Sequence, residues 1–122
     1  MNGYEENEHF GIQFIIRVPK QQRNERASVY ARITVNGRRS EISLKAKVLS
    51  KNWDEVKGKA KGKREDVIKL NNHIERVLSL ITDCYHQLIQ QRQPVTVEAV
   101  KSLYLGEDTK EKSYITKTVG IS

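Results

Sequence analysis

With 122 residues, of which 37% are hydrophobic and 30% are charged, the chain is expected to form a single domain with a modest core. Its formal net charge of +7 is concentrated in residues 17–69, which contain 16 of the 22 Lys and Arg residues but six of the 15 acids, and this excess favours a polyanionic partner. The single cysteine, Cys84, excludes an intrachain disulfide and a cysteine-based zinc site. No apolar run approaches the roughly 20 residues that span a membrane, and the acidic N-terminus lacks the apolar run of a secretory signal. We therefore expect a cytoplasmic protein without membrane contact.

The first predicted strand follows a polar, acidic segment at residues 1–9, which we expect to be a flexible lead-in. Apolar side chains recur at every second position over residues 10–18, which predicts a strand with Gln13 and Arg17 on its opposite face. A proline ends this strand, and residues 20–26 form a polar, basic loop. The length of that loop leaves open which strand pairs with the first one.

A β-hairpin is predicted over residues 29–44. Residues 29–35 alternate between apolar and polar side chains, and Asn36-Gly37 is typical of a type I′ turn, because both turn positions need a positive φ. On this register the apolar residues share one face, while an Arg and a Glu form an opposite-charge pair on the other. The predicted pairs are Val35 with Arg38, Thr34 with Arg39, Ile33 with Ser40, Arg32 with Glu41, Ala31 with Ile42, Tyr30 with Ser43 and Val29 with Leu44.

The remaining segments predict a loop and two helices. Residues 45–63 are irregular and very basic, and we expect Trp53 to anchor this loop on the sheet rather than to stack on a base. Residues 64–91 have one apolar stripe at helical spacing, with Cys84 as a small core residue. A short helix follows at residues 97–105.

The ends of the short helix are also indicated by the sequence. Thr96 precedes it as the N-cap and Gly106 follows it at the C′ position. Residues 107–122 mix charged, Ser and Thr residues without a clear period, and we interpret them as a linker.

Signals for catalysis are weak. His73 and His86 lie 13 residues apart on the long predicted helix, roughly 20 Å along its axis, which is too far for one metal ion. The acid pairs Asp54-Glu55 and Glu65-Asp66 are better explained as caps of loop and helix ends. The chain has no glycine-rich phosphate loop and no nucleophile elbow. We therefore expect no active site, metal, cofactor or small-molecule substrate.

The polar face of the predicted strands is the strongest candidate for a binding site. Arg can bond guanine O6 and N7, Gln can bond adenine, and Thr can touch the thymine methyl, so these side chains suit double-stranded DNA. A solvated face with basic residues that protect sheet edges is the alternative explanation. The candidates for contacts with bases or their flanks are Gln13, Arg17, Tyr30, Arg32, Thr34 and Arg39. The candidates for phosphate contacts are Arg38, Lys45, Lys47, Lys51, Lys57, Lys59, Lys61 and Lys63.

An ordered set of motifs over residues 10–106 resembles the N-terminal arm-type DNA-binding domain of tyrosine recombinases, or phage-type integrases, of the kind found on bacterial conjugative and mobilisable transposons. These motifs are the alternating strand at residues 29–35, Asn36-Gly37-Arg38-Arg39, Trp53-Asp54, the Gly/Lys loop at residues 57–63, Leu70-Asn71, and the closing helix within residues 94–106.

The resemblance implies an α+β fold, in which a three-stranded antiparallel sheet packs against the long helix and inserts into the major groove of arm-type sites. It also implies a bacterial, nucleoid-associated parent protein with core-binding and catalytic domains after this region, and recombinase protomers or accessory factors as partners. The implied catalytic domain does not fit within these 122 residues, in which Tyr104 and Tyr114 lie near the end, so the chain itself is expected to bind DNA without cutting it.

Two other functions remain open from the sequence. A protein-interaction module of a recombination complex would use the long helix and Ile15, an apolar residue on the polar face. An RNA-binding domain would use the same basic surface.

Overall fold

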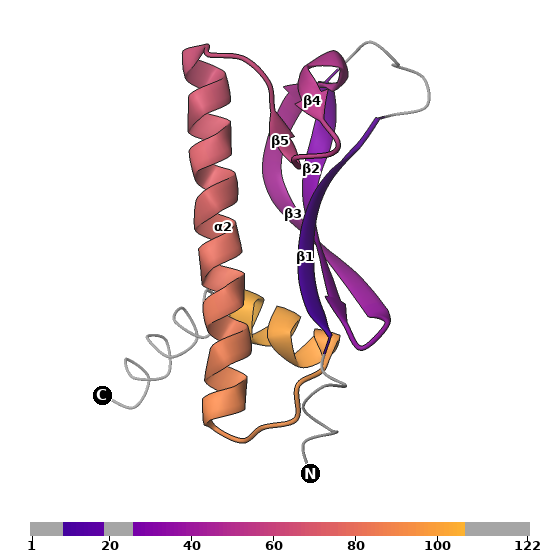
Figure 1. The fold of residues 1–122 in the computed structure, drawn as a ribbon, viewed down its shortest axis with the longest axis vertical. Coiled ribbons are helices and arrows are strands. Elements are labelled where there is room, and N and C mark those ends of the chain that lie inside the picture. The colour runs from indigo at the N-terminus through magenta and orange to yellow at the C-terminus, as the bar shows by residue number, and fades with distance from the viewer. Residues whose placement is uncertain (1–8, 19–25, 107–122) are drawn as a thin grey trace, which may run out of the picture.

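The computed structural model describes residues 9–18 and 26–106. Most of the predicted lead-in, most of the first loop, and all of the C-terminal linker with Tyr114 lie outside these residues. A three-stranded antiparallel sheet in the order β1-β2-β3 packs with one face against a long helix, and a small two-stranded ribbon lies beside both (Figure 1). The predicted α+β class is confirmed. The elements are β1 (Phe10–Arg17), β2 (Arg26–Val35), β3 (Arg38–Leu49), the 3-10 helix η1 (Ser50–Asn52), β4 (Trp53–Asp54), β5 (Lys59–Ala60), α2 (Glu65–Gln90), and a short helix at residues 97–106.

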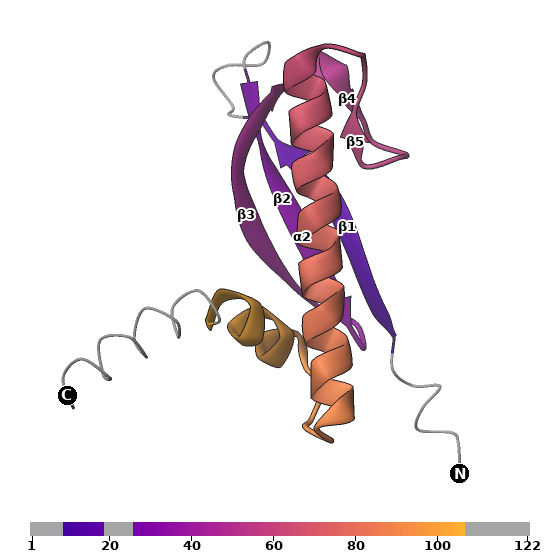
Figure 2. The same ribbon diagram turned by 90° about the vertical axis from the view of Figure 1, so that its left-hand side faces the viewer.

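The core lies between α2 and one face of the sheet. We call this face the inner face, and it contains the odd-numbered residues of β2 and the residues that pair with them in β1 and β3. The helix α2 runs along this face of the sheet (Figure 2). Val29, Ala31 and Ile33 are fully buried there and belong to the same core as the apolar stripe of α2. Burial of alternate residues explains why β2 alternates in sequence, and the buried stripe explains the helical period of α2. Cys84 is part of this core, as predicted.

The hairpin turn forms where the Asn-Gly pair predicts it, with φ of 51° at Asn36 and 89° at Gly37. The Asn36 Oδ1 atom also accepts a hydrogen bond from the backbone N–H of His9 at 2.9 Å, which ties the turn to the start of β1. The pairing of the first strand, left open by the sequence, is with β2, and Arg17 lies opposite Ser28. The confirmed hairpin pairs run from Val35 with Arg38 to Tyr30 with Ser43.

The seventh predicted pair, Val29 with Leu44, is wrong, because a bulge shifts the register between Ser28 and Tyr30. Lys45 has a φ of 56° in the bulge, and its backbone N–H donates to Ser43 Oγ at 3.0 Å. The carbonyl oxygen of Leu44 lies 3.1 Å from His73 Nε2 of α2. Pairing then resumes, so β3 extends beyond the point where the sequence predicts a loop.

The second half of the predicted loop is also structured, as the ribbon β4–β5. Trp53 is 5% exposed and packs in the core, so its predicted role as an anchor is confirmed. The side chain of Asn71 on α2 binds β5 at both backbone groups of Ala60, accepting from its N–H at 2.9 Å and donating to its carbonyl oxygen at 3.0 Å. Gly58 (φ 66°) brings the ribbon turn close to the backbone of Phe14 in β1.

The short helix begins as predicted, because Thr96 Oγ1 accepts a hydrogen bond from the backbone N–H of Ala99 at 3.0 Å. It includes Gly106 in its last turn, whereas the sequence places this glycine one position after the helix. Val97 and Val100 bury its apolar side in the core. None of the helices within residues 9–18 and 26–106 has the length and hydropathy to cross a membrane.

Candidate nucleic-acid interface

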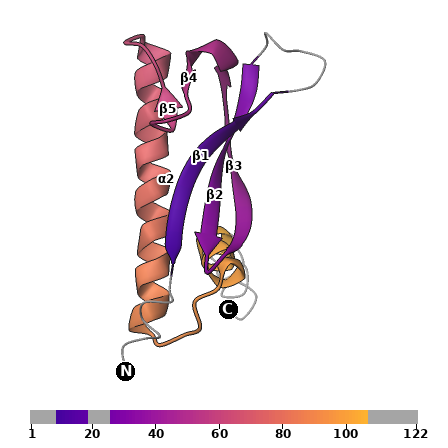
Figure 3. The same cartoon turned by 45° about the vertical axis from the view of Figure 1, so that its right-hand side comes forward.

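The opposite face of the sheet, which we call the outer face, contains all six residues predicted to contact bases. The helix α2 lies behind the inner face and the ribbon lies next to β1, so no described element covers the outer face (Figures 1 and 3). The sheet register places Gln13, Arg32 and Glu41 in one row across the three strands, with Thr34 and Arg39 in the adjacent row. The structure therefore brings these candidates together as one polar surface.

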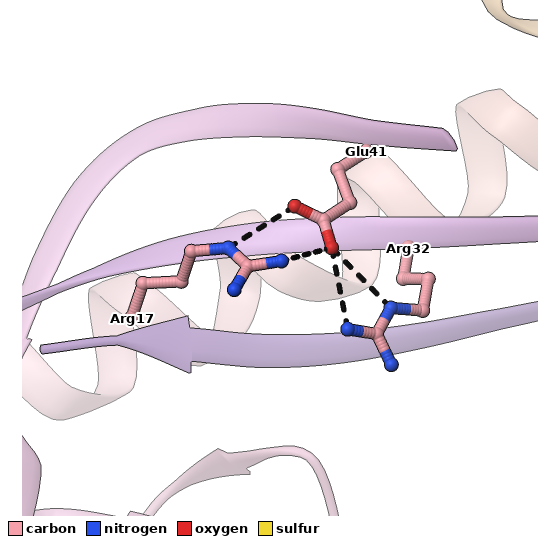
Figure 4. Close-up of polar contacts among 3 residues, drawn as sticks. All are labelled: Arg17, Arg32 and Glu41. Atoms are coloured by element: carbon pink, nitrogen blue, oxygen red, sulfur yellow. Dashed lines mark hydrogen bonds and ion pairs between the residues drawn. The ribbon is translucent and has the colours of Figure 1, made fainter. Parts of the chain in front are cut away.

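Glu41 lies at the centre of this surface and binds two of the predicted arginines (Figure 4). Arg17 Nε donates to Glu41 Oε1 at 3.2 Å, and Arg17 Nη2 donates to Oε2. Arg32 donates to the same Oε2 atom from Nε at 3.4 Å and from Nη2 at 3.3 Å. The sequence predicts the pair of Arg32 with Glu41. It does not predict the contact of Arg17, because the sequence leaves open which strand pairs with the first one.

The two arginines keep Glu41 ionised. Hydrogen bonds from Arg17 are the main cause of the lowered pKa of the Glu41 carboxyl group, with a smaller contribution from Arg32 and an opposing effect of burial. The Arg17 guanidinium also lies over the ring of Tyr30, with its Cζ atom 5.7 Å from the ring centroid, within the range of a cation–π contact. Arg17 thus lies along the sheet surface instead of projecting from it.

The seven predicted phosphate-contacting lysines are all exposed, and four of them lie along the two edges of the sheet. Lys45 and Lys47 belong to β3 at one edge. At the other edge, Lys57 and Lys59 line a groove of about 440 Å³ together with Gln13 of β1. The remaining lysines are Lys51 in η1 and Lys61 and Lys63 after the ribbon.

Arg38 is separated from the other candidates. Its partner in the sheet is Val35, whose side chain is buried in the core, so Arg38 lies at the hairpin end towards the short helix. There its Nη1 atom is 4.0 Å from Glu98 Oε2. This ion pair is exposed, and Arg38 is not part of the outer face.

One acid of each pair, Asp54 and Asp66, accepts hydrogen bonds from nearby backbone N–H groups. Asp54 Oδ1 accepts hydrogen bonds from the backbone N–H groups of Val56 and Lys57, both at 3.0 Å, and the bond from Lys57 is the main cause of the lowered pKa of Asp54. Asp66 Oδ1 accepts from the backbone N–H of Val67 at the start of α2. Within the described parts of the chain, no three His, Cys, Asp or Glu side chains are grouped as metal ligands would be.

A comparison with protein families identifies a match to the model of the arm DNA-binding domain over residues 14–101. Neither a curated protein nor a solved structure is significantly similar to the chain. The matched segment includes the three strands except the start of β1, the ribbon, α2 and the first half of the short helix. This match covers well over half of the chain, and the protein therefore belongs to the family of arm DNA-binding domains.

Proposed function

We propose that residues 10–106 bind double-stranded DNA by inserting the outer face of the sheet into the major groove. The observation that carries this proposal is that the six predicted base-contacting side chains share one face of a three-stranded sheet, which no element within residues 9–18 and 26–106 covers (Figures 1 and 3). Strands lie about 4.8 Å apart, so three strands are roughly 10 Å wide between their outer backbones, and the major groove is about 12 Å wide.

The positions of the lysines support this orientation. A sheet within the groove would have a sugar–phosphate backbone along each edge, and lysines are exposed at both edges. Lys45 and Lys47 would contact one backbone, and Lys57 and Lys59 the other. Such contacts give affinity for any duplex, whereas Arg, Gln and Thr side chains on the face distinguish bases.

The family assignment supports a non-catalytic role in DNA recombination. The resemblance to integrase arm domains further supports binding at arm-type sites during integration of a mobile element in the bacterial cytoplasm. In this proposal the parent protein is a tyrosine recombinase, and its protomers and accessory factors are partners. The test is the coding sequence downstream, where a His-x-x-Arg box and a nucleophilic Tyr are expected.

The experiment for DNA binding starts with selection of the best duplex from a randomised pool. Arg39→Ala should weaken binding to that duplex by about 1–3 kcal/mol and reduce discrimination against scrambled duplexes. Arg76→Ala is the matched control, because it removes the same charge from an exposed position on α2. Equal losses on selected and scrambled duplexes would contradict base contact by this face.

The same titration separates the other candidate functions. If the unmodified protein binds duplex DNA no more tightly than about 10⁻⁴ M at physiological salt, the charge serves another purpose and a protein partner becomes the better explanation. Stronger binding of duplex or single-stranded RNA than of DNA would favour an RNA-binding domain.

A further inference from the structure

We propose that Glu41 determines the sequence selectivity of the outer face by holding Arg17 and Arg32 for bases and disfavouring their contact with phosphates. In this role Glu41 is a positioning residue. The inference rests on the proposed DNA-binding function and specifies how its central side chains act.

The position of Glu41 is unusual for a surface that would face DNA. Among the residues of β1, β2 and β3 it is the only acid, and it lies on the outer face directly opposite Arg32. Its side chain is 26% exposed, so its charge interacts electrostatically with an approaching duplex. A carboxylate there repels phosphates and lowers general affinity for DNA.

The contacts show what the carboxylate does in return. Arg17 starts from the far edge strand, opposite Ser28 on β2, and reaches across Tyr30 to the same carboxylate that Arg32 binds. Two guanidinium groups from two strands are therefore held at one point of the face (Figure 4). Fixing flexible arginines before binding reduces the entropy lost when they contact a base.

This arrangement distinguishes two kinds of DNA acceptor. A guanidinium has five N–H groups, and the contacts with Glu41 engage Nε and Nη2 of each arginine, so other N–H groups remain able to donate to guanine O6 or N7. A phosphate would have to approach the Glu41 carboxylate or remove an arginine from it. Glu41 can also accept from cytosine N4. The chemistry of the cluster therefore fits a G·C base pair.

The test compares Glu41→Gln with Glu98→Gln, which also removes one negative charge beside an arginine but lies away from the outer face. The probes are a random-sequence 20-base-pair duplex pool (about two helical turns) and the best duplex selected with the unmodified protein. Glu41→Gln should bind the random pool about fivefold more tightly at roughly 0.15 M salt. Its slope of log K against log salt should steepen by about 0.9, because an arginine can now contact a phosphate.

Sequence selectivity is the measurement that distinguishes the two roles of Glu41, because a purely structural role would leave it unchanged. The ratio of selected to random affinity should fall for Glu41→Gln, and a new selection with this variant should lose a G·C preference that the unmodified protein shows. Glu98→Gln should change the random-pool affinity by less than about twofold, because charges beyond the Debye length of roughly 8 Å are screened.

Each outcome decides the inference. The inference is overturned, with the proposed function intact, if Glu41→Gln leaves three results unchanged: the salt slope of binding, the ratio of selected to random affinity, and the selected sequence. If these three results are unchanged and the melting temperature falls, Glu41 has a structural role only. Failure of the unmodified protein to bind any duplex would overturn the proposed function and this inference together. If Glu41→Gln does not fold, NMR of Arg17 and Arg32 Nε–H in the unmodified protein decides, since both signals must show their hydrogen bonds to Glu41 in the complex with the selected duplex.

Discussion

The side chain of Glu41 in β3 links all three strands, because it binds Arg17 of β1 and Arg32 of β2. This contact predicts a pH dependence of stability. The carboxyl group has a lower pKa in the folded protein than its ordinary value of 4.5, so its stabilising effect is complete above that value and is lost as the pH falls through the lower folded pKa. The free energy of unfolding should therefore decline faster on acidification for the unmodified protein than for Glu41→Gln.

Urea unfolding of the two proteins from about pH 6 to about pH 3 measures this effect. The difference between their free energies of unfolding cancels other titrating groups, including Asp54, whose pKa is also lowered. We expect the unmodified protein to be the more stable one at the upper end and the difference to shrink towards the lower end. A difference that stays constant over this range would show that the ion pairs of Glu41 do not stabilise the fold.

At the scale of elements, the ribbon β4–β5 depends on Asn71, whose side-chain amide replaces a neighbouring strand for Ala60. Asn71→Ala should lower the free energy of unfolding by about 1–3 kcal/mol, because it leaves a part-buried backbone N–H and carbonyl without their partner. It should also increase hydrogen exchange at the amide of Ala60. Asn72→Ala is the matched control, because Asn72 is the exposed neighbour on the same helix. Equal effects of the two substitutions would contradict this role of Asn71.

The elements that the sequence predicts are those with a regular buried face. The alternation in β2 and the stripe on α2 result from burial on one side, and the Asn-Gly turn sets the register by its own backbone requirement. The continuation of β3 and the ribbon depend instead on contacts from α2, by His73 to the bulge and by Asn71 to Ala60. Such contacts are distant in sequence, and lysine- and glycine-rich segments locally resemble loops.

The candidate site shows the same division. The register of the hairpin places Arg32, Thr34 and Arg39 on one face, which the sequence predicts from the turn alone. The contact of the second arginine, Arg17, with Glu41 requires knowing that β1 lies beside β2, and Arg17 then has to cross Tyr30. Alternation within a strand does not contain that information.

At the scale of the whole molecule, the positive charge is divided between a face and two edges. The face has arginines bound to an acid, and the edges have exposed lysines on β3 and on the ribbon. The sheet and the ribbon both pack against α2 and share one core. A duplex bound to the outer face as proposed would meet the lysines of both edges at once.

This geometry predicts that the two edges contribute alike to the salt dependence of binding. The double substitution of Lys45 and Lys47 by Gln, and separately that of Lys57 and Lys59, should each reduce the slope of log K against log salt by up to about 1.8 and weaken selected and random duplexes equally. Replacing Lys69 and Arg76 on α2 removes the same charge from outside the outer face and should leave the slope nearly unchanged. Fluorescence anisotropy titrations at several salt concentrations measure all three variants. If only one edge alters the slope, the sheet lies against a single DNA backbone and is not inserted in the groove, because insertion requires phosphates on both sides.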